Sequence, residues 1–332
     1  MSDVVGRRAL MGMTLALFAS LSPGGPAFAD NYPSRPITIV VPLAAGSGMD
    51  VLVRLYGERL SQRLGKPVIV ENKPGAAMMI GTVQVANAEP DGYTLVVATS
   101  SALAINPWLY KQINYDPDKD FVPLAWYVKS PFILIVNPAL PIKTVPELLK
   151  YAKEAKTPLN VSTPGAGTLQ HLSMEFVKQR FNVNMTHVPY RQTPQSITDI
   201  AAGHVDLAFA EAGATIPLIK DGKLRALAVS AANRLPLLPD VPPFAEAAGV
   251  SDFEAVSWHM LLAPAKTPKE IVDKLHNELK TIAEELEMKE RAAAIGLIPI
   301  EVPTIVATEA YVKSERAKWG ALVTKLGLAG SQ

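Results

Sequence analysis

The sequence predicts an α/β fold made of two domains joined by two crossing strands. The chain has 332 residues, enough for two domains of ~150 residues each. Short apolar, β-branched runs alternate with segments of helical periodicity, which is typical of a parallel or mixed sheet covered by helices. Two further apolar runs, at 132–136 and 259–263, are each followed by proline; the first lies between two series of such elements, and the second comes after the second series. We expect these two runs to be the crossing strands.

The first domain is expected to begin with a strand, a loop and a helix. Residues 37–41 form a β-branched run, and residues 51–64 carry Leu and Tyr at helical spacing. The same order repeats along the chain, with a strand at 68–70, a helix at 79–88, a turn at 90–92 and a strand at 93–98. Residues 30–132 are therefore predicted to be the first part of domain I.

A second series of alternating elements predicts domain II, over residues 133–256. Strands are expected at 159–162, 186–188, 205–209 and 224–229, and helices at 169–180 and 194–202. Two more helices, at 268–287 and 304–326, follow the second crossing strand. Residues 257–332 are therefore predicted to return to domain I.

The composition excludes several classes of function. Lys and Arg number 32 against 31 Asp and Glu, so no basic excess is present to neutralise a nucleic acid backbone. No cysteine occurs, which excludes thiolate metal sites, a cysteine nucleophile and disulfides. The five histidines form no close ligand pattern. We expect a monomer without nucleic acid, metal or cofactor.

The first 29 residues have the pattern of a signal peptide. Arg7 and Arg8 give a positive start, residues 9–21 form an apolar stretch too short to span a bilayer, and residues 27–29 read Ala-Phe-Ala, a small-x-small cleavage site. The sequence therefore predicts a periplasmic protein that is cleaved after about Ala29. The paired arginines leave the Sec and twin-arginine export routes both open.

Two glycine-containing loops have matching positions, one in each predicted domain. Residues 42–50 and 162–168 each follow a strand and open a helix. Glycine lets the backbone approach a ligand closely, and the first amides of a helix are unpaired donors that favour an anion. For either loop alone a tight turn is the simpler interpretation, and residues 47–50 also fit a capping box. The matched pair favours a ligand held between the domains. A dinucleotide is disfavoured, because Val51 and Gln170 replace the third glycine of that motif.

Further motifs occur along nearly the whole mature chain. Besides the two glycine loops, they include YPSRPI at 32–37, ENKPGA at 71–76, PDGYTL at 90–95, AINP at 104–107, HVPY at 187–190 and GHVD at 203–206. Together these motifs resemble those of the Bug family of periplasmic receptors, the binding proteins of tripartite tricarboxylate transporters. The resemblance implies a two-domain periplasmic binding protein, or flytrap, with two crossing strands between its domains. It further implies a receptor that closes on a small carboxylate and delivers it to a membrane transporter of the tripartite tricarboxylate type.

The resemblance also implies that the two glycine loops hold the ligand carboxylate through backbone amides, hydroxyls and bridging waters. Ser47 and Thr168 are the expected donors from the two sides. The complete set of candidate ligand-binding residues is Leu43, Ala44, Ala45, Gly46, Ser47, Asp50, Met79, Ser100, Ser162, Gly165, Gly167, Thr168 and Arg191.

Departures from the family pattern bear on the ligand. Ala210 stands where the family often has Asp, and the loss of that acid argues against an amino-acid ligand. An apolar lining of the site could come from Met49, Met78, Met79 and Trp108, although ordinary core packing explains these residues equally well. We therefore expect an aromatic or aliphatic mono- or dicarboxylate.

Two other classes of function remain open at the level of the sequence. A sensor that acts through a signalling partner would bind its ligand in the same way. An exported hydrolase is the weaker alternative, because the chain has no Gly-x-Ser-x-Gly motif and its acidic pair Glu284-Glu285 lies in a predicted surface helix. We predict that the protein is not an enzyme.

Overall fold

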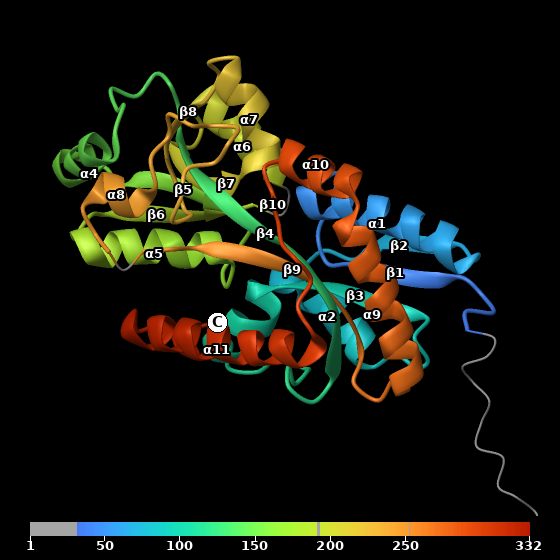
Figure 1. Cartoon of the computed structure of the whole chain (residues 1–332). Coiled ribbons are helices and arrows are strands. Elements are labelled where there is room, and N and C mark those ends of the chain that lie inside the picture. Colours follow the sequence, from blue (N-terminus) through green and yellow to red (C-terminus); the bar gives the residue numbers. More distant parts are fainter. Residues whose placement is uncertain (1–31, 191–192, 252) are drawn as a thin grey trace, which may run out of the picture. The chain divides into compact units, whose positions relative to one another are not determined.

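The strands are arranged in two groups that meet at one long strand, β4 (Phe121–Val136) (Figure 1). The structure is a computed structural model that describes residues 32–190, 193–251 and 253–332. The first part of β4 pairs with β9 (Val256–Pro264), and its last residues, from Phe132 on, pair with β7 (Leu207–Glu211) and β8 (Arg225–Val229). The hydrogen-bonded path of strands is therefore continuous through β4. We call the strands on the β9 side the first group and those on the β7 side the second group.

The first group has the order β2-β1-β3-β9-β4. Strand β1 (Ile37–Val41) pairs in parallel with β2 (Val68–Asn72) and β3 (Thr94–Thr99), whereas β9 is antiparallel to β3 and β4. The helical segments between these strands are α1 (Gly48–Leu64), the 3-10 turn η1 (Ala76–Met78), α2 (Met79–Ala86), the π-helical turn η2 (Ser101–Ile105) and α3 (Asn106–Leu109). Strand β10 (Ile298–Pro299) also joins this group, through β4.

The second group continues from β4 in the order β7-β5-β6, with β8 also paired to β4. Strand β5 (Leu159–Thr163) is parallel to β6 (Met185–Pro189) and β7. Its helices are α4 (Val145–Glu154), α5 (Leu169–Phe181), α6 (Thr193–Ala202), α7 (Ala212–Lys220) and α8 (Phe244–Ala248). In a sheet of this kind the carboxyl ends of the parallel strands open into the loops that bind ligands.

The C-terminal helices pack against the first group. Helix α9 (Lys269–Glu284) contacts α1 and β4, α10 (Leu286–Ala294) follows it, and α11 (Ile305–Lys325) contacts η2 and β4. Trp126 of β4 stacks on Tyr311 of α11 with ring centroids 4.0 Å apart. Among the described residues, no helix combines the length and the apolar composition needed to cross a membrane.

The structure differs from the predicted elements mainly at β4 and α9. The run 132–136 is the end of a 16-residue strand rather than a separate short strand. Its length is not evident from the sequence, because Pro123 and Pro131 lie within it and proline normally interrupts a strand. The strand accommodates Pro123 at a register shift against β9. The helix predicted over 268–287 breaks at Glu285, whose ψ of 130° is extended.

The predicted domain boundaries stay a prediction, because Pro33–Gln332 form one compact unit. Ala255 still bonds the second group, since its N–H donates to the carbonyl of Ser230, and β9 begins at the next residue, Val256, beside Pro131. The predicted signal peptide and cleavage site lie outside the described residues.

Candidate functional site

The first glycine loop joins β1 to α1 and is shaped by the start of that helix. Ser47 is the N-cap, and its Oγ accepts a hydrogen bond from the Asp50 N–H at 3.2 Å. Gly46 has a φ of +81°, a left-handed value that favours glycine. The Gly46 N–H donates to Asp50 Oδ2 at 2.9 Å, so the carboxylate binds this amide and not that of Ser47 as a capping box would require.

Asp50 holds this loop from the inside. Its residue is 3% exposed, and its carboxylate pairs with Arg54 at 3.0 Å and accepts from Asn72 Nδ2 at 2.9 Å. The same Asn72 nitrogen donates to the Leu43 carbonyl at 3.0 Å. Burial opposes ionisation of Asp50, but the hydrogen bonds from Arg54, Gly46 and Asn72 hold its pKa below the usual value. Asp50 therefore fixes the conformation of the loop, in which Ala45 and Gly46 are exposed.

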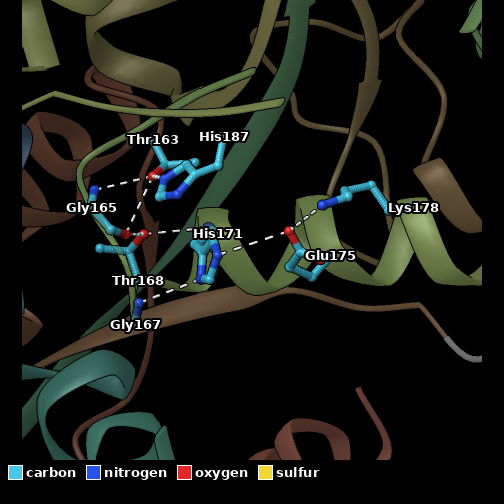
Figure 2. Close-up of polar contacts among 8 residues, drawn as sticks. All are labelled: Thr163, Gly165, Gly167, Thr168, His171, Glu175, Lys178 and His187. Atoms are coloured by element: carbon cyan, nitrogen blue, oxygen red, sulfur yellow. Dashed lines mark hydrogen bonds and ion pairs between the residues drawn. The ribbon is translucent and has the colours of Figure 1, made fainter. Parts of the chain in front are cut away.

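The second glycine loop joins β5 to α5 and is closed by two threonine hydroxyls (Figure 2). Thr168 is the N-cap of α5: its Oγ1 accepts from the His171 N–H at 3.3 Å and donates to the Gly165 carbonyl at 2.8 Å. Thr163 Oγ1 accepts from the Gly165 N–H at 3.1 Å. Because the Thr168 hydroxyl forms hydrogen bonds within the loop, its first role is to fix the start of α5.

Two histidines pack together behind the second loop. The rings of His171 and His187 have centroids 4.5 Å apart, and His187 Nε2 lies 2.6 Å from Thr163 Oγ1. The Gly167 N–H donates to His171 Nδ1 at 3.5 Å (Figure 2). Burial lowers the pKa of both rings, that of His171 to about 4. The rings are therefore neutral near pH 7, and His171 can accept from the loop.

Each loop contacts the opposite group of strands. Gly48, at the start of α1, lies close to the carboxylate of Glu211 at the end of β7, since a Cβ added at Gly48 would be 3.5 Å from Glu211 Oε2. Tyr110, which follows α3, donates its hydroxyl to the Ala166 carbonyl at 3.1 Å. A Cβ added at Gly167 would come within 3.0 Å of Tyr110. We call these two contacts between the groups, that of Gly48 with Glu211 and that of Tyr110 with Ala166 and Gly167, the seam.

Several other predicted site residues are engaged elsewhere. Ser100 is buried with its Oγ 2.9 Å from that of Ser257, and Ser162 is buried and accepts from Ser196 at 2.7 Å. Met79 begins α2 and is half-buried. Arg191 lies outside the described residues.

The proposed apolar lining is also divided. Met78 Sδ accepts from the Thr99 hydroxyl at 3.1 Å, and Met49 is fully buried. The ring of Trp108 lies against Gly320 of α11, where an added Cβ would be 2.3 Å from it.

Comparison with known proteins agrees with this architecture. The sequence matches the family described as "Tripartite tricarboxylate transporter family receptor" over residues 52–328. The chain belongs to this receptor family. It is 30% identical to Protein BugT of Bordetella pertussis over 319 residues, which are 96% of this chain and 97% of BugT. The resemblance to Bug receptors is thereby confirmed.

Solved structures of the family confirm the fold class. Rpa4515 of R. palustris, determined with adipate, has a TM-score of 0.85 and 33% identity over 90% of this chain and 99% of its own. MatC of Rhodopseudomonas palustris, with bound malate, has a TM-score of 0.82 and 31% identity over 88% of this chain and 100% of its own. The chain therefore has the α/β periplasmic binding protein fold. Members of this receptor family are periplasmic solute-binding proteins, which are not enzymes.

Sequence reasoning missed the residues that face the receptor's glycine loops from across the seam. Glu211, Tyr110 and Asn106 come from segments far from the loops they contact. The available signal for Glu211 was its place at the carboxyl end of a predicted strand, since ligands gather at this edge of an open α/β sheet.

A metal site and an apolar cavity are the two other kinds of site that such a receptor could contain. Within residues 32–190, 193–251 and 253–332, no three His, Asp or Glu side chains lie together as a metal site would require. A cavity of about 260 Å³ lies between α5 and α11, lined by Leu172, Phe176, Phe253 and Trp319 among others. None of the candidate ligand-binding residues lines this cavity.

Proposed function

We propose that this receptor binds a small carboxylate at the seam, between its two glycine loops, and delivers it to a membrane transporter of the tripartite tricarboxylate type. The observation that carries the proposal is the position of the two helix N-termini. Each of the two helices α1 and α5 is preceded by a glycine-containing loop with a hydroxyl N-cap, and each loop or helix start contacts the opposite group of strands. Backbone N–H groups at helix N-termini, supported by the helix dipole, form a favourable site for an anion.

The chemistry of the loops favours backbone amides as the ligand's donors. The hydroxyls of Ser47 and Thr168 already accept from the amides of their own helices. A carboxylate that lies against both loops would accept from amides of both groups of strands and would therefore favour their close approach. A ligand that binds the closed arrangement better than the open one shifts the population toward closure.

The class of ligand is an aromatic or aliphatic mono- or dicarboxylate. Adipate and malate, the acids found with Rpa4515 and MatC, support a carboxylate of this size. Ala210, which is buried in the core of the second group, offers no carboxylate for the ammonium group of an amino acid. Export to the periplasm follows from the pattern of residues 1–29 and from the family.

Binding can be tested by calorimetry and by thermal unfolding of purified protein that has been stripped of co-purified ligand. The panel should contain adipate, succinate, malate, benzoate and phenylacetate, with aspartate and citrate as discriminating compounds. A ligand at ~100 times its dissociation constant should add ~2.7 kcal/mol to the free energy of unfolding. Binding of aspartate or citrate alone would contradict the proposed ligand class, and no binding of any carboxylate would contradict the site.

Two variants, in each of which an exposed alanine is replaced by aspartate, test the location of the ligand. Ala45→Asp places an anion in the exposed part of the first loop and should weaken carboxylate binding by about tenfold or more, because like charges ~5 Å apart repel strongly near a protein surface. Ala307→Asp is the control, since Ala307 is also exposed but lies in the first turn of another helix, α11. Equal affinities in the two variants would move the ligand away from the first loop.

Delivery to a transporter needs a separate test. Crosslinking of the ligand-loaded receptor in cell envelopes should capture a membrane subunit, and capture of a sensor protein in its place would favour the signalling function.

A further inference from the structure

Glu211 is a carboxylate of the second group that reaches the first glycine loop. It is the last residue of β7 and stands at the N-cap position of α7, yet its side chain makes no capping hydrogen bond to that helix. The carboxylate instead lies beside Gly48, the first residue of α1. A Cβ added at Gly48 would lie 3.5 Å from Glu211 Oε2, so the carboxylate is in van der Waals contact range of the loop backbone.

A ligand carboxylate at this position would meet the same groups of α1 as the Glu211 carboxylate does. The first amides of α1 lack partners within the helix and lie at the positive end of its dipole. Burial raises the pKa of Glu211, and the Gly48 amide opposes this rise. The start of α1 is therefore the group that favours the ionised form of Glu211.

The other carboxylate of the loop has a different role. Asp50 is held by the Arg54 ion pair, by Asn72 and by the Gly46 amide, all within the first group. Of these two carboxylates, only that of Glu211 comes from the second group of strands, on the opposite side of the seam.

We propose that Glu211 occupies the place of a ligand carboxylate at the N-terminus of α1, so that an anionic ligand binds by displacing it. This inference rests on the proposed function. Displacement moves the Glu211 carboxylate away from the positive end of the α1 dipole before the ligand takes its place there. Glu211 thereby sets a threshold: a carboxylate must gain enough from the rest of the seam, including the second loop, to replace it.

The test is a calorimetric comparison of the wild-type protein with Glu211→Gln, using the panel of acids named above. Glutamine keeps the size of the side chain but removes the charge, so it competes less well for the Gly48 amide. We expect the acids that bind the wild-type protein to bind Glu211→Gln about tenfold more tightly. Glu211→Asp keeps the charge on a shorter side chain and should also tighten binding, which provides a second variant if the first folds poorly.

Glu147→Gln is the matched control. Glu147 is also a carboxylate at the start of a helix, where it completes the capping box of α4, and its replacement changes the net charge by the same amount. Affinity in this variant should equal that of the wild-type protein, and thermal unfolding should show that all variants are folded.

The outcomes separate this inference from the proposed function. Weaker binding in Glu211→Gln would mean that Glu211 accepts directly from the ligand, and unchanged binding would mean that its contact with Gly48 is only structural; either result overturns displacement while the carboxylate site stands. Absence of binding to any variant overturns both proposals.

Discussion

Lowering the pH from 7 to 5 should destabilise the protein, because the folded protein holds buried histidines that are neutral at pH 7. His259 lies in β9 and is 2% exposed, and His171 lies in α5 and is 5% exposed. His259 Nδ1 is buried without a hydrogen-bond partner in the part of the chain that the structure describes. Burial lowers the pKa of each of these rings from 6.5 to about 4. Protonation must then bring a charge into surroundings that cannot solvate it.

The size and sign of the effect follow from proton linkage. The folded state binds the proton less tightly than the unfolded state, so the stability contributed by each ring is complete above pH 6.5 and is lost as the pH falls toward 4. Between pH 7 and pH 5 each ring should cost about 2 kcal/mol of the free energy of unfolding. Most carboxylates remain ionised in this interval, and the raised pKa of Glu211 acts in the opposite direction.

The assay is urea unfolding at pH 7, 6 and 5 of the wild-type protein and of His259→Phe. Phenylalanine has a similar ring and no titration, so the variant should lose about 2 kcal/mol less between pH 7 and pH 5. At an m-value of ~3 kcal/mol/M this difference corresponds to ~0.7 M in the urea midpoint. The contribution of Glu211 is the same in both proteins and cancels in the comparison.

If His259→Phe and the wild-type protein lose stability in parallel between pH 7 and pH 5, the reasoning from burial is wrong.

Three further substitutions should give measurable effects. Gly167→Ala should lower the unfolding free energy by about 2 kcal/mol, since its φ is +83° and the new Cβ would lie 2.9 Å from Asn106 Oδ1; Gly46→Ala, which has nearly the same φ, +81°, but whose added Cβ meets open space, should cost less in the same urea titration, and equal costs would exclude the contact. Ala77→Gly should raise the unfolding free energy by about 0.5–1 kcal/mol, because Ala77 has a φ of +48°; a lower melting temperature would argue against backbone strain there. Asp50→Ala should cost about 2 kcal/mol and weaken carboxylate binding, as it leaves the Gly46 amide without its acceptor, and unchanged values in unfolding and calorimetry would contradict its role in the loop.

Much of the fold could be predicted because its signals are local. The apolar run at 37–41 and the helical spacing of 51–64 predict β1 and α1, and Gly65 ends α1 in the left-handed conformation with a φ of +67°. Both glycine loops could be found for the same reason. The length of β4 could not, because prolines that normally interrupt a strand are accommodated here by pairing with β9.

The contacts across the seam could not be predicted, since they depend on how distant segments approach one another. In the sequence, Glu211 is simply the residue that follows Ala210, the position at which the family often has Asp. Its neighbours in the sequence do not indicate a contact with Gly48. The burial of His259 is likewise a property of the packed sheet, because its strand neighbours are Thr99 of β3 and Val128 of β4.

This division explains why the sequence identifies a carboxylate receptor more readily than it identifies the carboxylate. The hydroxyls of Ser47 and Thr168 serve their own helices, so the donors that remain for a ligand are backbone amides, which many different sequences can provide. Amides recognise the charge and the shape of a carboxylate but carry little information about the rest of the molecule. If the carboxylate binds as proposed, discrimination among acids depends on side chains that reach the loops from the opposite group of strands, and Glu211 is a charged residue of this kind. The comparison of the wild-type protein with Glu211→Gln consequently tests whether this side chain determines which acid the receptor binds.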